Sequence, residues 1–135
     1  DDRFLNRKQH EKRFKATIDV IGAVLGDDLA KLEFRATRLF YPLFCAIYHM
    51  QFGLPRLQAP RRAIKVGDHA RLKGVVEEVE ELIGKIRAAK KAHDGVELSA
   101  EQRKFYEAYD ERWVHAANRI ILTQYLCREF VRALK

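Results

Sequence analysis

The segment from Phe34 to Pro55, FRATRLFYPLFCAIYHMQFGLP, carries much of the aromatic content of the chain. Between residues 39 and 52 it offers little polar surface on any side of a helix, which is typical of a helix surrounded by neighbours. Pro42 is tolerated in the first turn of a helix, because its missing N–H group would have no partner there. We therefore expect a central helix that begins near residues 39 to 41 and ends at Gly53.

Two longer segments with apolar residues at helical spacing flank this helix. The first runs from about Phe4 to Leu25 and is followed by Gly26, a residue type that commonly ends helices. The second runs from about His69 to Ala92, after Asp68, which is a suitable N-cap. Its apolar stripe has a heptad-like spacing and consists of Leu72, Val75, Val79, Leu82 and Ile86. Four glutamates are expected on its outer face: Glu77, Glu78, Glu80 and Glu81.

The last third of the chain opens with a clear helix start. Ser99 followed by Gln102 fits a capping box, in which each side chain bonds to the backbone of the other residue. No proline or glycine interrupts the sequence from there to Lys135, but one helix of that length would be unusual, so we expect a bend near residues 113 to 117. The segments together predict an all-α fold, a compact bundle of four to five helices around the central apolar helix (about 39–52). We expect one domain that spans residues 1–135.

The excess of basic residues indicates a polyanionic partner. The chain has 26 Lys and Arg against 19 Asp and Glu, a net charge of +7, and such charges bind phosphates with release of counterions. DNA is therefore the first partner to test. The irregular stretch from Gly53 to Gly67 carries the residues that we predict to contact phosphates: Arg56, Arg61, Arg62 and Lys65. The weaker candidates are Lys85, Arg87, Lys90 and Lys91, because cations near a helix end also offset the helix dipole.

Cysteine usage and apolar run lengths indicate the compartment. Cys45 and Cys127 lie far apart and have no CxxC spacing, so we expect both to be reduced residues of the core. The first residues contain no apolar stretch typical of a secretory signal. The apolar run from Leu39 to Tyr48 is well short of the ~20 residues that a membrane span requires. We therefore expect no membrane contact and a cytoplasmic location.

No catalytic or cofactor-binding set is recognisable. The five histidines are too dispersed for the spacings that place two imidazoles on one helical face, so we predict no metal site. No glycine-rich loop has the context of a phosphate cradle, and we expect no cofactor. His49, at the end of the apolar helix, is interpreted as a core-edge histidine bonded to backbone groups. The residues alone predict a basic helical domain and do not specify its activity.

A family resemblance takes the interpretation one step further. The segment FRATRLFYPLFCAIYHMQFGLP, with a preceding helix that ends in GDD and the later segment WVHAANRIILTQYL, resembles the C-terminal helical region of GmrSD-type proteins. These bacterial proteins have a ParB/sulfiredoxin-like N-terminal domain. The resemblance runs from about Phe4 to Lys135 and is a pattern of hydrophobic and aromatic residues.

The resemblance implies that the chain is the C-terminal part of a longer protein. In the family, a DGQQR-like motif of the N-terminal domain is linked to nucleotide-dependent nuclease action against foreign or modified DNA. That motif is absent from this sequence, so no catalytic residue is carried over. The leading hypothesis is a non-catalytic accessory domain of a GmrSD-type DNA-targeting defence protein, which contributes DNA contact or assembly. Its expected partners are DNA, an N-terminal nuclease or NTPase domain, or a partner subunit.

Two other hypotheses stay open. The chain can be an oligomerisation or partner-docking module without nucleic-acid binding, in which the helix of residues 69 to 92 pairs with another chain, including a second copy of itself. An exposed apolar stripe through Val75, Val79 and Leu82 would support that interpretation. A small helical enzyme that uses His49 or His115 ranks last, because no second catalytic group is spaced to assist either histidine.

Overall fold

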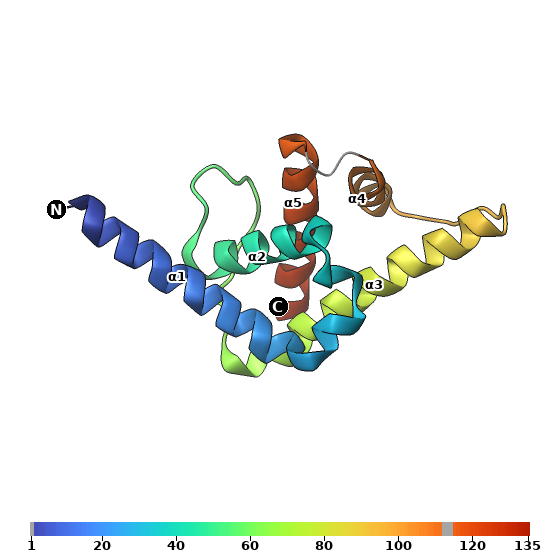
Figure 1. Ribbon diagram of the computed structural model, residues 1–135. Coiled ribbons are helices and arrows are strands. Elements are labelled where there is room, and N and C mark those ends of the chain that lie inside the picture. The colour runs from blue at the N-terminus through green and yellow to red at the C-terminus, as the bar shows by residue number, and fades with distance from the viewer. Residues whose placement is uncertain (1, 112–114) are drawn as a thin grey trace.

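The apolar segment forms helix α2 (Thr37–Phe52), which lies in the middle of the molecule (Figure 1). The computed structural model describes residues 2–111 and 115–135. Helix α5 (Ala116–Leu134) packs most extensively along α2, and α1 (Asp2–Leu25) packs against another side of it. The short 3₁₀ segment Glu33–Arg35 also contacts α2. The prediction of a central apolar helix covered by its neighbours is confirmed.

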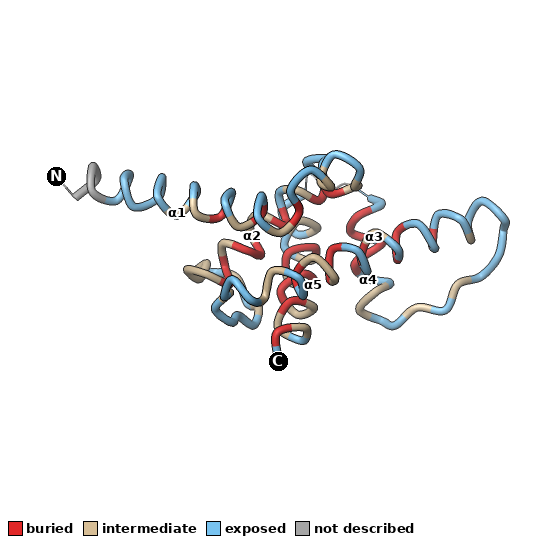
Figure 2. Tube along the Cα trace, turned by 90° about the horizontal axis from the view of Figure 1, so that it is seen from below, coloured by how far each residue is buried: buried red, intermediate tan, exposed pale blue. Residues whose placement is uncertain are grey.

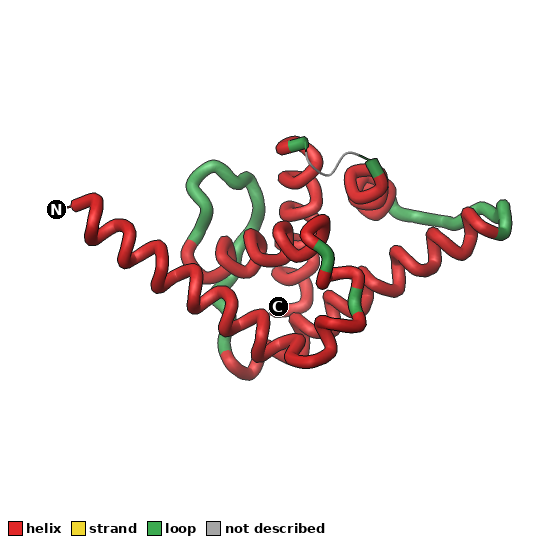
Figure 3. Tube along the Cα trace, in the orientation of Figure 1, coloured by secondary structure: helices red, strands yellow, loops and turns green. Residues whose placement is uncertain are grey.

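Helices α3 (His69–Lys91) and α4 (Ala100–Asp110) complete the bundle, and both pack against α5. The described part of the chain contains five α-helices and no strand (Figure 3). The predicted all-α bundle of four to five helices is therefore confirmed. Residues 6–12 of α1 and the end of α3 after Ile86 extend away from the body and are largely exposed (Figure 2).

The start of α2 differs from the prediction. The N–H groups of Leu39 and Phe40 both donate to the carbonyl of Ala36, at 3.0 and 2.8 Å, so the first turn is closed before residue 39. The helix begins at Thr37, and Pro42 lies in its second turn rather than its first. The predicted end is correct, because Gly53 has a φ of 81° and donates its N–H group to the carbonyl of His49.

The two predicted caps have different outcomes. The capping box is confirmed, because the N–H of Gln102 donates to Oγ of Ser99 at 3.1 Å and the N–H of Ser99 donates to Oε1 of Gln102 at 3.0 Å. Asp68 is the N-cap residue of α3, as predicted, but its side chain forms no capping hydrogen bond with that helix. Its Oδ2 instead accepts the N–H of Lys65 at 2.9 Å, which closes the 3₁₀ turn Val66–Asp68 before α3. A local turn therefore uses the carboxylate that the helix would have used.

Helix α3 also differs from the prediction on its acidic face. Glu80 is half-buried and its Oε1 accepts the N–H of Phe34 at 3.1 Å, whereas the other three glutamates are exposed. Burial raises the pKa of the Glu80 carboxyl above its ordinary value. The apolar stripe through Val75, Val79 and Leu82 is buried inside the protein. It therefore does not offer the exposed helix face that docking through α3 would require.

The long C-terminal stretch is divided into two helices, as the predicted bend implies. Helix α4 ends at Asp110 and α5 begins at Ala116, and Trp113 lies outside the described residues. Both cysteines are free; Cys127 is fully buried, and Cys45 is only partly buried. None of the described helices is both long enough and apolar enough to cross a membrane.

Two buried groups predict a loss of stability in alkaline solution. Burial raises the pKa of the Tyr125 hydroxyl and that of the Cys127 thiol to about 12, from ordinary values of 10.0 and 9.0. Because the folded chain holds these protons more tightly than the unfolded chain, their stabilisation is complete below about pH 9 and is lost as the pH rises toward 12. The free energy of unfolding, measured by urea denaturation, should therefore fall between about pH 9 and pH 11.

The variant Tyr125→Phe provides the control for this pH dependence. It removes one of the two ionising groups and should make the decrease in the free energy of unfolding shallower. A free energy that stays constant over this pH range in the unmodified chain contradicts the assignment of these buried protons.

Candidate nucleic-acid interface

The basic loop extends from Gly53, just after α2, to Lys65, just before the turn Val66–Asp68. It contains all four residues predicted to contact phosphates and no acidic residue. Arg56, Arg61, Arg62 and Lys65 are all exposed in the structure. Within the described residues, neither Arg56 nor Arg62 forms an ion pair with a carboxylate.

His49 holds the first part of the basic loop against α2. Its ring is buried, with 4% of its surface exposed. Its Nδ1 accepts the N–H of Leu54 at 2.8 Å, so the hydrogen of the neutral ring lies on Nε2 and is donated to the carbonyl of Ala59 at 3.0 Å. The prediction of a histidine bonded to backbone is confirmed. Because both nitrogens bind backbone groups, this ring has no free nitrogen to act as a general base.

Arg61 holds the second part of the basic loop. Its Nε donates to the carbonyl of His49 at 2.9 Å, and its Nη2 donates to that of Met50 at 3.3 Å. Carbonyls in the last turn of a helix have spare acceptor capacity, and the guanidinium adds a donor both to Met50 and to His49, whose carbonyl also accepts the N–H of Gly53. The side chain lies so close to Gly53 that a Cβ there would be 3.4 Å from Nη1. Arg61 is therefore part of the loop anchor, and only its remaining donors can reach a phosphate.

Helix α5 anchors the same loop from its other side. The side-chain amide of Gln124 donates to the carbonyl of Gln58 at 3.0 Å. Apolar side chains of the loop, Leu57, Ala59 and Ile64, pack against the core. The loop thus presents its exposed arginines from a backbone that is attached to both α2 and α5.

A basic part of α1 lies at the same end of the molecule and was not predicted as a site. The side chains of Arg7, Lys12 and Lys15 are exposed, and the guanidinium of Arg13 lies 5.2 Å from the ring centre of Phe52 at the end of α2. This contact brings α1 next to the residue that precedes the basic loop. A cavity of about 570 Å³ lies here, lined by Lys8, Gln9, Lys12, Arg13, Ala16 and Phe52.

The second predicted basic cluster, on α3, is partly neutralised within the protein. Arg87 pairs with Glu33 at 2.5 Å and donates to the Tyr109 hydroxyl at 2.7 Å. Lys90 pairs with Asp110 at 3.4 Å. Of this cluster, Lys85 and Lys91 remain exposed without an ion pair among the described residues. The preference for the basic loop over this cluster is therefore supported by the charge pairing.

The comparisons with known proteins found no match to this chain among family models, curated proteins or solved structures. The resemblance to GmrSD-type proteins thus remains an expectation. In the part of the chain that the structure describes, no group of three or more histidine, cysteine or acidic side chains is placed to hold a metal ion.

The neighbouring arginines 61 and 62 should respond differently to truncation. Arg61→Ala removes a charged donor from two carbonyls and should lower the free energy of unfolding by about 1 to 2 kcal/mol. Arg62→Ala removes an exposed side chain and should change it by less than about 0.5 kcal/mol. Urea denaturation of both variants measures the difference.

The variant Arg61→Lys separates charge from geometry. A lysine keeps the positive charge but lacks the planar fork of donors, so most of the stability lost in Arg61→Ala should stay lost. Equal stability of the Arg61→Ala and Arg62→Ala proteins would show that the loop does not depend on this anchor.

Proposed function

We propose that this chain is a non-catalytic helical domain that binds the phosphate backbone of double-stranded DNA. The contact surface consists of the basic loop, through Arg56, Arg62, Lys65 and the free donors of Arg61, and of the basic residues of α1 near it. The observation that carries the proposal is an acid-free loop whose arginines are exposed while its backbone is anchored to α2 and α5. An anchored backbone reduces the entropy that would be lost on binding.

The chemistry of this surface favours backbone contact over reading of bases. Guanidinium and ammonium groups form charge-assisted hydrogen bonds with phosphate oxygens, and such contacts position a protein on DNA without specifying sequence. Affinity that comes from these groups falls steeply with salt, because each neutralised phosphate releases counterions. The expected behaviour is therefore salt-dependent binding with little sequence preference.

The resemblance to GmrSD-type proteins suggests a role for such binding. In a protein of that type, the nuclease chemistry is associated with another domain, and this domain would hold the DNA or contribute to assembly. The position of His49 agrees with a non-catalytic role, since both of its ring nitrogens bind backbone groups. Defence against foreign DNA is the proposed context, and a cytoplasmic location is expected for it.

A variant without the exposed basic groups of the loop tests the proposal. Arg56→Ala, Arg62→Ala and Lys65→Ala are combined, and Arg61 is kept because it anchors the loop. Fluorescence anisotropy with a labelled duplex at several salt concentrations should show weaker binding. The slope of log K against log salt should become shallower by about 0.9 for each phosphate contact that is lost.

A matched variant on the distant helices controls for net charge. Lys85→Ala, Lys91→Ala and Lys104→Ala remove the same charge from exposed positions of α3 and α4. This protein should keep the original salt slope. Equal losses of affinity in the two triple variants would point to bulk charge, and unchanged binding in the loop variant would contradict the assigned surface.

A further inference from the structure

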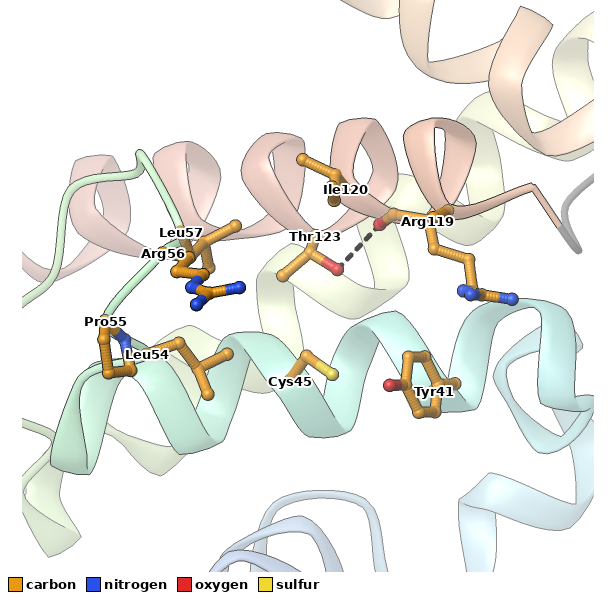
Figure 4. Close-up of a pocket in the computed structure, with 10 residues that line it drawn as sticks. Tyr41, Cys45, Leu54, Pro55, Arg56, Leu57, Arg119, Ile120 and Thr123 are labelled. Atoms are coloured by element: carbon orange, nitrogen blue, oxygen red, sulfur yellow. Dashed lines mark hydrogen bonds between the residues drawn. The ribbon is translucent and has the colours of Figure 1, made fainter.

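An apolar groove lies between α2 and α5, next to the start of the basic loop (Figure 4). It has a volume of about 480 Å³, within the range of pockets that bind ligands. The two helices and the basic loop all contribute apolar side chains to it: Tyr41 and Cys45 of α2, Ile120 of α5, and Leu54 and Leu57 of the loop. We call it the α2–α5 groove. It is distinct from the basic face of α1.

The walls of the α2–α5 groove expose large apolar side chains. Tyr41 and Ile120 have 49% and 48% of their surface exposed, although both lie on the two most closely packed helices of the fold. The half-buried thiol of Cys45, one turn after Tyr41 on α2, also lines the groove, and burial raises its pKa. The hydroxyl of Thr123 donates to the carbonyl of Arg119 at 2.8 Å, so it is satisfied within α5. The groove therefore offers a largely apolar surface to a partner.

The charges of the α2–α5 groove are all positive and lie at its two ends. Figure 4 shows Arg56 beside Leu54 and Pro55 at one end, and Arg119 beside Tyr41 at the other. The guanidinium of Arg119 lies 5.8 Å from the ring centre of Tyr41. No residue that lines the groove is acidic. The surface thus combines an apolar centre with a cation at each end.

The groove is also elongated in the direction of α2. Tyr41 and Cys45 are one helical turn apart, and the wall continues to Leu54 just beyond the end of the helix, a distance of about three to four turns. An elongated apolar groove between two helices is suited to the apolar face of a third helix, which contributes side chains at positions i, i+3, i+4 and i+7. Separated cations suit a partner with acidic residues at both ends of that face better than they suit a small ligand with one anionic group.

We propose that the α2–α5 groove docks an amphipathic helix of a partner protein whose apolar face is flanked by acidic residues at both ends. This assigns the docking function to a different surface from the one that the sequence indicated, since the apolar stripe of α3 is buried. The proposal does not depend on DNA binding. Arg56 borders both surfaces, so the decisive variants are placed on α5, outside the basic loop.

The test uses two labelled synthetic helical peptides of about 16 residues. Both carry leucines at positions i, i+3, i+4 and i+7; one has glutamates at both ends and the other has lysines there. Fluorescence anisotropy with the full chain should show saturable binding of the glutamate peptide and at least tenfold weaker binding of the lysine peptide. Arg119→Glu should reduce this preference at least tenfold, because it reverses the charge at one end of the groove.

A pair of apolar substitutions locates the binding. Ile120→Ser should lower the affinity for the glutamate peptide at least fivefold, because it removes an apolar contact from the wall of the groove. Val66→Ser removes a branched side chain that is 83% exposed outside the groove and should leave the affinity unchanged. Both variants should keep the helical circular-dichroism spectrum and the cooperative urea transition of the unmodified chain, which shows that they are folded whether or not the chain binds DNA.

Three results would overturn the docking proposal: absence of saturable binding of the glutamate peptide up to millimolar concentration, equal affinities for the two peptides, or equal effects of Ile120→Ser and Val66→Ser. None of these results bears on the basic loop, whose test is the salt slope of DNA binding.

Discussion

The burial of α2 is the constraint on which the rest of the structure depends. A helix that is apolar on nearly every side is stable in water only when other elements cover it. In this chain α5 and α1 cover most of its length, the segment Glu33–Arg35 contacts it, and the basic loop returns over its C-terminal end. The same requirement therefore builds the core and determines where the basic loop lies.

The C-terminal end of α2 connects the core to both proposed functional surfaces. Carbonyls in its last turn have spare acceptor capacity, and Arg61 from the loop donates to two of them, those of His49 and Met50. His49, in the same turn, binds the loop backbone at Leu54 and Ala59. These contacts occupy two of the donors of Arg61, one of the four predicted phosphate ligands, and they hold the other three on a defined surface. The start of the loop also closes one end of the α2–α5 groove, through Leu54 and Arg56.

Features encoded by neighbouring residues were predictable from the sequence. The central position of α2, the capping box at Ser99 and the backbone role of His49 follow from local pattern, and the structure agrees with each. Features that depend on contacts between distant segments were not predictable. Glu80 faces inward because it binds Phe34, and Arg61 acts as an anchor because the loop folds back on α2. The basic part of α1 that we propose as part of the surface was not predicted, because a run of basic residues on a helix ordinarily indicates only a solvated face.

The most direct test of the proposed DNA contact is to map it residue by residue. In an NMR titration of the ¹⁵N-labelled chain with a short DNA duplex at low salt, the amide signals that shift should belong to the basic loop and to residues 7–15 of α1. Those of residues 85–91 at the far end of α3 should stay in place. Shifts centred on α3, or spread evenly over all basic residues, would contradict the account.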